Sequence, residues 1–508
     1  MERLSFIQPD SLREQANRAA GLINDSTRVL AVSHIDADGI TSLAIVVTML
    51  ERLGKTVFWR NIHQLNSETI LDVKRLVGEF RPNLVIFTDL GSGQMNLVRQ
   101  SVRGEPGVEA VVVLDHHIPS DEEAESWIAG NARGIVEVNP CQHGMVGSSD
   151  LSGAGLAFLV AYVLSTENVD LSELAVVGAT GDLQDYYGRG FTGMNKAIIG
   201  LAQSHGYIKV HRDLTFFGIS TRPLPFLLEY TTDPYLPGIT GNRGGCFDFF
   251  NKLGIPLKDG DDNWRTWADL ERDEKKRVIQ TLIDVLLQTY ESAKAATAII
   301  GDVMTLIRRP PKTDLRTAKE FSTLLNACGR NKRAEVGVRI CFGDSDAWHE
   351  GQTLLQQHRS NLASALRRLE IGGVEERPGM YLVMDPETPD TIVGVVIGMA
   401  QGSRIIPTDK PVVGVSAKTS GEGPMLKVSG RAANDLVKRG VNLREVFVTA
   451  SKSLNDAHGR MVAEGGGHPM AAGAFVHSDY LDEFLDIVSN LIAHVLQSTN
   501  ERKREDRG

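Results

Sequence analysis

Four apolar segments near the start of this chain each end in side chains that can bind a divalent metal ion. Mixed carboxylate and imidazole ligands suit Mn²⁺ or Mg²⁺, and Mn²⁺ is favoured because imidazole seldom binds Mg²⁺. Two such ions about 3.5–4 Å apart can hold the attacking and leaving oxygens in a displacement at phosphorus. We therefore predict a site for two Mn²⁺ ions, with Mg²⁺ as the alternative. The candidate side chains are, segment by segment, His34 with Asp36 and Asp38, then Asp89, then Asp115 with His116 and His117, and finally Asp182.

The first of these motifs is more specific than the others. A single aspartate at the end of a strand is more often a helix cap or a turn residue than a ligand. Asp-His-His is a common string, and taken alone it fits a structural role as well as a chemical one. The H-x-D-x-D-G segment from His34 to Gly39 is harder to explain by capping, because three ligand-type residues follow one apolar strand. Structural zinc would need thiolates, and none lies nearby, so the four motifs together favour a Mn²⁺ or Mg²⁺ site.

A second group of candidate residues lies near the C-terminus, where the chain is rich in glycine. Residues 465–469 read Gly-Gly-Gly-His-Pro, so backbone N–H groups could approach an anion closely while His468 donates to a phosphate oxygen. Ser429-Gly430-Arg431 offers a hydroxyl and a guanidinium two residues apart, which could grip one phosphate. Taken alone, the glycine run is more often a flexible turn, and the second segment fits a hairpin end with a surface arginine equally well. Both alternatives stay open at this point.

The elements that must position the first group alternate between strand-like and helix-like segments. This alternation predicts a parallel sheet with helices on both faces, which is the α/β class. Such folds carry their chemistry in loops at the carboxyl ends of the strands. The four segment ends should therefore meet at one edge of the sheet. The expected strands are residues 28–33, 56–60, 84–88 and 110–114, and the expected helices are residues 40–53 and 152–164.

The remainder of the chain changes character after the first domain, which we expect at residues 1–204. Residues 205–375 read as a mostly helical middle region, with long helices at 267–296 and 350–369 and a shorter helix that ends at Arg330. Residues 376–500 read as a smaller α/β domain, and residues 501–508 as a charged tail that should be frayed. In the C-terminal domain we expect strands at 380–384, 392–397, 411–417 and 425–429, a Gly-rich turn at 420–423 and a helix at 480–496.

The composition fits a soluble globular protein of two or three domains. The chain has 508 residues, of which 42% are hydrophobic and 23% are charged, and these shares are close to the average for soluble proteins. No apolar run approaches the roughly 20 residues that span a bilayer, and residues 1–10 carry no signal-peptide pattern. Four isolated cysteines fit a reducing cytoplasm. We expect a cytoplasmic protein without membrane contact, and the net charge of −10 counts only weakly against binding of nucleic acid.

At these motifs the sequence resembles the DHH phosphoesterase superfamily. The segments SHIDADGITS, FTDLGSG, LDHH and GATGDLQD resemble its four motifs in the right order, and GGGHPMAAG resembles the signature of its DHH-associated C-terminal domain. VNP (138–140) and LSGAGLAF (151–158) are similar to the RecJ branch, as is the chain length. LLNACGR (324–330) resembles archaeal RecJ-like proteins. The resemblance covers both ends of the chain well, and the middle only at this last stretch.

The resemblance implies a role for each motif residue. One metal ion would be held by His34, Asp36 and Asp89, and Asp89 would also bind the second ion. His117 would face the scissile phosphate, and Asp115 would orient the histidine pair. The second domain would hold the terminal or scissile phosphate, with His468 also among the expected catalytic residues. The other implied ligands of the second ion are Asp38, His116 and Asp182, and the implied substrate-binding residues are Ser429, Arg431, Gly466, Gly467 and His468.

One position departs from the bacterial RecJ pattern. The first motif of bacterial RecJ usually begins with an aspartate, whereas this chain has His34. Histidine is shared by the archaeal branch and by pyrophosphatase-like members, so it favours an archaeal-type protein and weakens any transfer of the bacterial 5′→3′ polarity. We also find no bacterial-type oligonucleotide-binding domain after the C-terminal motif, so affinity for long DNA would depend on a partner.

Three functions compete at this stage. The first is a metal-dependent exonuclease that releases mononucleotides from single-stranded DNA or RNA in replication or repair. The second is a replisome scaffold that binds the GINS complex and the replicative helicase, although every metal position is filled here. The third is a phosphodiesterase for short oligoribonucleotides, cyclic dinucleotides or phosphoadenosine phosphate, against which the chain length and the middle region argue.

Several properties stay open in the sequence, namely polarity, the choice between DNA and RNA, the physiological metal and the oligomeric state. Aromatic side chains that stack on bases would help to hold single strands. The candidates fit core positions equally well, and we expect them to lie in the core. These candidates are Tyr186, Tyr187, Phe216 and Phe217.

Overall fold

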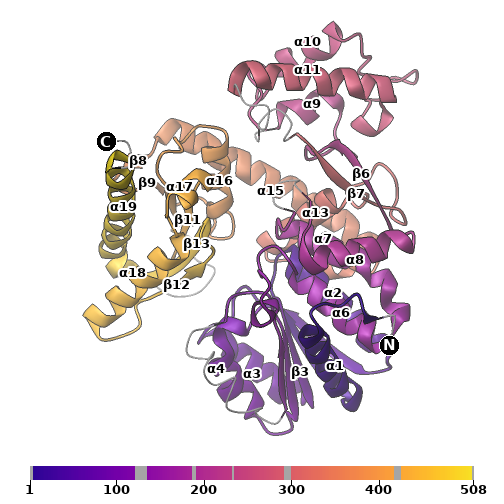
Figure 1. Cartoon of the computed structure of the whole chain (residues 1–508), viewed down its shortest axis with the longest axis vertical. Helices are drawn as coiled ribbons and strands as arrows, with labels where there is room; N and C mark the ends of the chain where they lie inside the picture. Colours follow the sequence, from indigo (N-terminus) through magenta and orange to yellow (C-terminus); the bar gives the residue numbers. More distant parts are fainter. Residues whose placement is uncertain are drawn as a thin grey trace. The chain divides into compact units, whose positions relative to one another are not determined.

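The chain divides into two compact units (Figure 1). The first unit contains residues 1–231 and 237–355, and the second contains residues 232–236 and 356–508. All four cysteines are free, as expected. None of the described helices combines the length and the hydropathy that a membrane span requires. The structure is a computed structural model that describes residues 4–119, 134–185, 190–231, 234–290, 299–416 and 425–505.

A parallel sheet of five strands forms the centre of the first unit, and it confirms the predicted α/β class. The strand order is β2-β1-β3-β4-β5, and every neighbouring pair is parallel. The order reverses at β1, so β1 and β3 form a switch point, where ligands of open parallel sheets bind beyond the carboxyl ends of the strands. The four expected strands are confirmed and a fifth is added: β1 (Arg28–Ser33), β2 (Thr56–Asn61), β3 (Leu84–Thr88), β4 (Ala110–Leu114) and β5 (Ile135–Val138).

Both faces of this sheet are covered by helices, which explains why its central strands are apolar along their whole length. On β3, Leu84 and Ile86 face one helical layer, whereas Val85 and Phe87 face the other. This alternation follows from the two-residue repeat of a strand. The first layer holds α1 (Asp10–Asp25), α2 (Ala37–Arg52) and α6 (Gly153–Leu164), and the second holds α3 (Thr69–Phe80) and α4 (Met95–Val98) (Figure 1). Behind the first layer, α7 (Ser172–Gly181) packs on α2 and α6, and α8 (Gly193–Ser204) packs on α7.

The segment that ends in Asp182 is a helix rather than a strand at the sheet edge, and this corrects our expectation. The helices α6 and α7 are both buried along nearly their whole length. Small residues let them approach each other, since a Cβ atom on Gly178 would lie 2.5 Å from the Cβ atom of Ala154. A short apolar run does not by itself distinguish a buried helix from a buried strand. Asp182 therefore reaches the site from the end of α7.

The middle region combines helices with a two-stranded sheet. We expected it to be mostly helical, and the antiparallel pair of β6 and β7 is a feature that the sequence pattern missed. The short helix that was expected to end at Arg330 is confirmed as α13, and its Leu324 belongs to the same core as α2 and α7. The helix expected at 267–296 begins at Arg272, and residues 291–296 lie outside the described residues. The elements are β6 (Ile208–Leu214), α9 (Leu224–Glu229), α10 (Arg243–Lys252), α11 (Arg272–Tyr290), β7 (Ile300–Leu306), α13 (Ala318–Arg330), α14 (Ala334–Cys341) and α15 (Ser345–Gly372).

A mixed sheet of six strands forms the second unit, in the order β12-β13-β11-β10-β9-β8. Only β9 and β10 pair in parallel, and the other neighbours are antiparallel. One face packs on α18 and α19 through Phe447 and Phe484, and the other packs on α16 through Ile397. The elements are β8 (Glu375–Glu376), β9 (Tyr381–Met384), α16 (Val393–Gly402), β10 (Val412–Ser416), β11 (Met425–Arg431), α17 (Asn434–Lys438), α18 (Leu443–His458), β12 (Ala463–Gly467), β13 (Ala471–His477) and α19 (Leu481–Glu505).

Two expectations for the second unit are wrong. Residues 392–397 were expected to form a strand, but they lie at the start of α16, where packing against the sheet overrides the strand preference of valine and isoleucine. The charged tail was expected to fray from residue 501, but α19 continues to Glu505. The turn expected at 420–423 lies outside the described residues, and the domain boundaries at 204 and 375 stay predictions.

Candidate metal centre

The metal-binding candidates gather at the switch point between β1 and β3. The loop after β1 carries His34 and Asp36 to the start of α2, and Asp89 directly follows β3. Asp36 is the N-cap of α2, where its Oδ1 atom accepts a hydrogen bond from the N–H group of Gly39 at 3.0 Å. Asp36 is therefore a helix cap, but capping occupies only one of its two carboxylate oxygens.

The first group of possible ligands contains His34, Asp36 and Asp89. The Nδ1 atom of His34 lies 3.0 Å from Asp36 Oδ2 and 3.5 Å from Asp89 Oδ2. Burial alone would lower the pKa of His34, but the two carboxylates raise that pKa well above its ordinary value. Burial would raise the pKa of Asp36, but pairing with His34 lowers it far below its ordinary value. The ligand atoms of the group all lie within 4.8 Å of one another, so one ion could contact all three.

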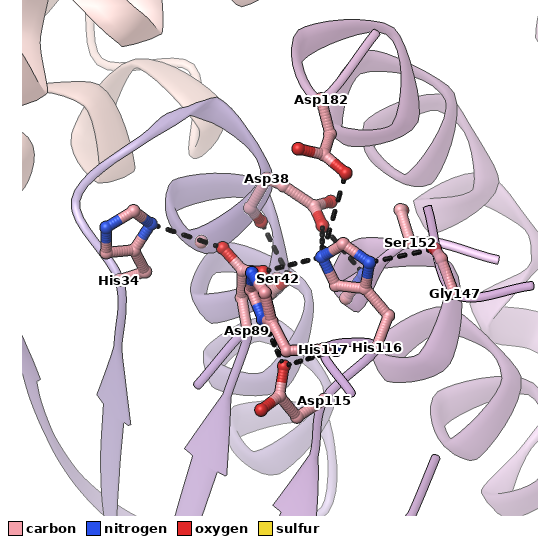
Figure 2. A network of polar contacts seen from close by, with 12 residues as sticks. His34, Asp38, Ser42, Asp89, Asp115, His116, His117, Gly147, Ser152 and Asp182 are labelled. Carbon is pink, nitrogen blue, oxygen red and sulfur yellow. Dashed lines mark hydrogen bonds and ion pairs between the residues drawn. The ribbon is translucent and has the colours of Figure 1, made fainter. Parts of the chain in front are cut away.

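His116 lies at the centre of the second group (Figure 2). Its Nε2 atom lies 3.2 Å from Asp89 Oδ1, 3.6 Å from Asp182 Oδ2 and 3.8 Å from Asp38 Oδ2. The ligand atoms of Asp38, His116 and Asp182 again lie within 4.8 Å of one another. Asp89 turns one carboxylate oxygen toward each group, so it is the residue that joins the two groups.

Hydrogen bonds on its far side fix the orientation of His116. Its Nδ1 atom lies 2.9 Å from the carbonyl oxygen of Gly147, so Nδ1–H donates there and Nε2 is left to face the carboxylates. Metal-binding histidines usually have their second nitrogen held in this way. The buried Gln184 donates from Nε2 to the Gly147 oxygen at 3.0 Å and to Asp182 Oδ2 at 2.9 Å. Gln184 thus ties His116 and Asp182 together, a role that the sequence did not indicate.

The first turn of α6 holds Asp38 in place. Its carboxylate accepts one hydrogen bond from the N–H group of Gly153 at 2.7 Å and another from that of Ala154 at 3.0 Å. The start of a helix stabilises negative charge in this position. Glycine is required at 153, because a Cβ atom there would lie 2.9 Å from the Cβ atom of Asp89.

The buried carboxylates of Asp38 and Asp89 share this small space with the partly exposed carboxylate of Asp182, and their negative charges repel one another. Burial and the charge of Asp89 raise the pKa of Asp38 well above its ordinary value. Burial and the charge of Asp89 also raise the pKa of Asp182, whereas the charge of His116 lowers it. Asp89 Oδ2 is buried, and apart from its ion pair with His34 at 3.5 Å it has no hydrogen-bond partner among the described residues. A divalent cation would relieve the repulsion and contact this oxygen, so the residues present fit a hard divalent metal ion.

His117 and Asp115 form a pair beside the second group. The Nδ1 atom of His117 lies 2.7 Å from Asp115 Oδ1, and the N–H group of Ser92 donates to the other carboxylate oxygen at 2.8 Å. The side chain of Asp115 is 1% exposed, whereas that of His117 is 43% exposed. Burial would lower the pKa of His117, but Asp115 raises it above its ordinary value. Asp115 can therefore orient a partly exposed histidine from inside the protein.

Helix α13 contributes three residues that the sequence motifs did not assign to the site. Asn326 Oδ1 accepts a hydrogen bond from the first N–H group of α2 at 3.0 Å. Gly329 lies against the backbone of Ile35 so closely that a Cβ atom would overlap the Ile35 carbonyl oxygen. Burial lowers the pKa of Arg330, and the charge of Asp36 raises it. The guanidinium therefore interacts electrostatically with the first group of possible ligands. The LLNACGR stretch at residues 324–330 was the sequence feature that could have pointed to these contacts.

The predicted phosphate-binding residues lie in the second unit. Ser429 on β11 is paired with Gly473 on β13, and Gly473 is paired with Gly466 on β12. Arg431 lies two residues further along β11, on the same face as Ser429. The glycine run forms strand β12 rather than the flexible turn that was its alternative. The remaining predicted residues are Gly467, which ends β12, and His468, which follows it.

Two of the four aromatic candidates for base stacking lie among the described residues. Phe216 is buried, as expected, and Phe217 is half-buried. Residues 186 and 187 lie outside the described residues. The exposed aromatic rings of the middle region come from other positions, with Tyr230 52% and Trp264 40% exposed.

Three known domains match this chain. Residues 28–181 match the N-terminal domain of the DHH family, residues 216–300 match the DHH-CID domain, and residues 380–494 match the DHHA1 domain. The metal-binding candidates lie in or directly beside the first of these domains, and the phosphate-binding candidates lie in the third. The chain therefore contains a DHH domain, a DHH-CID domain and a DHHA1 domain.

The relatives of this chain include RecJ exonucleases. It is 28% identical to an uncharacterized protein of Methanocaldococcus jannaschii over 94% of this chain and 96% of that protein. It is also 28% identical to the single-stranded-DNA-specific exonuclease RecJ of Bacillus subtilis, over 34% of this chain and 21% of that enzyme. For RecJ of Thermus thermophilus the identity is 28% over 39% of this chain and 28% of that enzyme. These relationships support a metal-dependent phosphoesterase.

Solved structures share the fold across nearly the whole chain. RecJ of Thermus thermophilus in complex with Mn²⁺ matches with a TM-score of 0.55 at 18% identity, over 97% of this chain and 56% of that protein. CDC45 of Entamoeba histolytica matches with a TM-score of 0.60 at 12% identity, over 95% of this chain and 97% of that protein. At these identities the likeness shows the fold alone.

Proposed function

We propose that this protein is a metal-dependent exonuclease that hydrolyses phosphodiester bonds of single-stranded DNA or RNA and releases mononucleotides. The Asp89 carboxylate carries this proposal, because its two oxygens face two separate groups of possible ligands. A shared carboxylate suits two divalent ions at the short separation that in-line displacement at phosphorus requires. The imidazoles favour Mn²⁺, with Mg²⁺ as the alternative.

The residues of the site divide into ligands and groups that contact the phosphate. When bound, two such ions lower the pKa of a water molecule and offset the negative charge that develops at phosphorus. His117, held by Asp115, would donate a hydrogen bond to a phosphate oxygen, and Arg330 would add positive charge beside the first group. The ligands would be His34, Asp36 and Asp89 for one ion, and Asp38, Asp89, His116 and Asp182 for the other.

Single-stranded nucleic acid is the substrate class that the similar proteins favour. Two of them carry the name single-stranded-DNA-specific exonuclease. In the second unit, Ser429, Arg431 and His468 offer a hydroxyl, a guanidinium and an imidazole for phosphate groups of a strand. RNA stays in the proposal beside DNA, since the sequence carries no motif that fixes a contact to the 2′-hydroxyl.

A replisome scaffold that binds the GINS complex and the replicative helicase is the alternative. The fold is compatible with it, since CDC45 of Entamoeba histolytica matches with a TM-score of 0.60. The site favours the enzyme, because crowded and buried carboxylates are costly to maintain without a cation. A phosphodiesterase for short oligonucleotides is the third candidate, and the dependence of rate on substrate length separates it from the first.

The test is digestion of single-stranded DNA and RNA, each labelled at the 5′ or the 3′ end, with Mn²⁺ or Mg²⁺. We expect progressive release of mononucleotides by the wild-type chain and none by Asp38→Ala. The matched control is Asp72→Ala, which removes a carboxylate whose side chain is 64% exposed on α3 and should leave cleavage unchanged. Equal cleavage by Asp38→Ala, or no cleavage of any strand by the wild-type chain, would contradict the proposal.

A further inference from the structure

A bulky apolar residue, Leu183, follows α7 in a backbone conformation that favours glycine. Its φ is 56°, in the left-handed region that bulky side chains seldom adopt. The N–H group of Leu183 donates to the carbonyl oxygen of Thr180 at 3.2 Å. The next N–H group, that of Gln184, donates to the carbonyl oxygen of Ala179 at 3.0 Å. These two bonds form the Schellman motif that ends many helices, and its left-handed position usually holds glycine.

Burial of the side chain compensates little for this unfavourable backbone conformation. Leu183 is 59% exposed, although leucine is one of the residue types that are most often buried. A residue other than glycine in the left-handed region costs stability, and such residues cluster at sites where function requires them. The exposed leucine therefore calls for a role outside the packing of the fold.

Leu183 lies directly beside the second group of possible metal ligands. Its neighbour on one side is Asp182, whose Oδ2 atom lies 3.6 Å from the Nε2 atom of His116. Its neighbour on the other side is Gln184, which donates to the carbonyl oxygen of Gly147 at 3.0 Å. Consecutive Cα atoms are about 3.8 Å apart. The leucine is therefore held between two residues that themselves contact the site.

Two further exposed aliphatic residues border the same group. Val146 is 58% exposed and precedes Gly147, whose carbonyl oxygen lies 2.9 Å from the Nδ1 atom of His116. Ile118 is 47% exposed and follows His117, whose ring centre lies 4.4 Å from that of His116. Figure 2 shows Gly147 and His117 beside the His116 imidazole. Together with the leucine after α7, these residues place exposed apolar surface around the second group.

We propose that Leu183 is a specificity-determining residue that packs against the base of the nucleotide bound at the metal centre. Carboxylates and imidazoles can hold metal ions and phosphate oxygens, but they offer little apolar surface to a base. Apolar side chains, leucine among them, pack against bases in protein complexes with nucleic acids. An aliphatic contact accepts every base and distinguishes a complete nucleotide from one that lacks its base. This inference rests on the proposed action on nucleic acid strands.

The distribution of the aliphatic residues favours a nucleotide over a protein partner. Binding sites for small ligands combine apolar surface with a few well-placed polar groups. The three exposed aliphatic residues follow this pattern, because they are interspersed with the polar groups of the site. Protein interfaces instead have a buried apolar core surrounded by a polar rim.

Thermal melts of the full chain without metal separate this role from a structural one. In Leu183→Gly the new residue suits the left-handed turn, and little buried surface is lost. Leu183→Asn is the second variant, because asparagine also tolerates this conformation. We expect Leu183→Gly to melt at the same temperature as the wild-type chain or higher. A clearly lower melting temperature in both variants would make Leu183 a packing residue of the fold and overturn the inference.

Single-turnover cleavage of strands that differ only in the terminal base tests the contact itself. The substrates are single-stranded DNA oligonucleotides with a normal terminal nucleotide, or with an abasic tetrahydrofuran residue at the 5′ or the 3′ end, in Mn²⁺. At protein concentrations below saturation, we expect the wild-type chain to cleave the normal end about tenfold faster, as burial of most of one leucine side chain implies. Both variants should cleave normal and abasic ends at nearly equal rates. The matched control Leu71→Asn changes a leucine that is 62% exposed on α3 and should keep the preference.

The outcomes separate this inference from the proposed function. Equal cleavage of normal and abasic ends by the wild-type chain would overturn the inference and leave the proposed nuclease standing. An unchanged preference in Leu183→Gly and Leu183→Asn would do the same. Cleavage of no strand by the wild-type chain would contradict the proposed nuclease, and the inference would fail with it.

Discussion

The Oδ1 atom of Asp89 lies 3.2 Å from the Nε2 atom of His116, and both side chains are almost fully buried. The backbone of Asp89 has a φ of 57°, in the left-handed region that residues other than glycine seldom adopt. Such a conformation costs about 1 kcal/mol or more, and it persists where the surrounding structure over-determines it. Here it lets a residue directly after β3 turn its two oxygens toward two groups of possible ligands, and this arrangement suggests the first prediction.

Asp89→Asn keeps the size of the side chain and removes the shared charge. We expect cleavage with Mn²⁺ to fall by about 1,000-fold or more, because metal ions supply several kcal/mol of charge stabilisation in the transition state. Single-turnover rates on end-labelled strands measure the effect. Asp72→Asn on the exposed face of α3 is the control and should cleave at the wild-type rate. A loss of less than tenfold in Asp89→Asn would exclude a bridging role.

Gln184→Leu removes the amide that ties Asp182 to the Gly147 carbonyl oxygen. We expect Mn²⁺ affinity to fall by about 10–100-fold, because residues that orient metal ligands typically contribute that much. Titration calorimetry with Mn²⁺ measures this affinity directly. Gln203→Leu, an exposed position near the end of α8, is the matched control. Unchanged Mn²⁺ binding in Gln184→Leu would show that the amide only fills space.

Gly153→Ala should disturb both the fold and the site, because the new Cβ atom would lie 2.9 Å from Asp89 Cβ and 3.1 Å from Asp38 Oδ2. We expect a loss of about 1–3 kcal/mol in the free energy of unfolding, as for other overpacked core positions. Urea unfolding of the metal-free protein measures it. Gly200→Ala in α8 has no atom within 4 Å of the new Cβ atom and should be neutral or stabilising. Equal stability of the two variants would refute the close fit around Asp38.

Mn²⁺ should raise the melting temperature of the wild-type chain. The carboxylates of Asp38, Asp89 and Asp182 repel one another, and only the folded chain brings them together. A ligand of the folded state at 100 times its dissociation constant adds about 2.7 kcal/mol to the free energy of unfolding. Thermal melts with and without Mn²⁺ measure the shift. His116→Ala should show a much smaller shift, and a full shift in that variant would place the stabilising ion elsewhere.

Lys427→Met should stabilise the protein at neutral pH, and the gain should shrink as the pH rises. The pKa of Lys427 is about 8 in the folded chain, against an ordinary value of 10.5. At pH 7 the lysine is charged in both states, so the folded chain bears the full cost of burying the charge. Between about pH 8 and pH 10.5 the folded state has released the proton and the unfolded state still binds it, so the stability of the wild-type chain rises. Unfolding curves at pH 7 and pH 10 test this, and a gain that is equal at both values would contradict it.

The short-range parts of this structure could be predicted because their patterns are local. Residues 29–32 are a continuous apolar run between Arg28 and Ser33, and such a run followed by a helical repeat indicates a parallel strand and its crossover helix. The candidate ligand residues that follow these strands could be expected to meet for the same reason, since parallel strands end at one edge. The same local criteria failed at residues 392–397, where an apolar run of strand-forming residues became the start of α16.

The sequence by itself determined the class of fold, the residue types of the candidate metal centre and the order of the motifs. Only the tertiary structure decided which atoms meet, because contacts between residues far apart in the chain depend on packing and not on local preference. It brought Asp182 from a helix end rather than a strand, placed Arg330 near Asp36, and laid the ammonium group of Lys427 over Gly473. Each of these arrangements depends on a glycine or a buried helix whose effect appears only when two distant segments pack together.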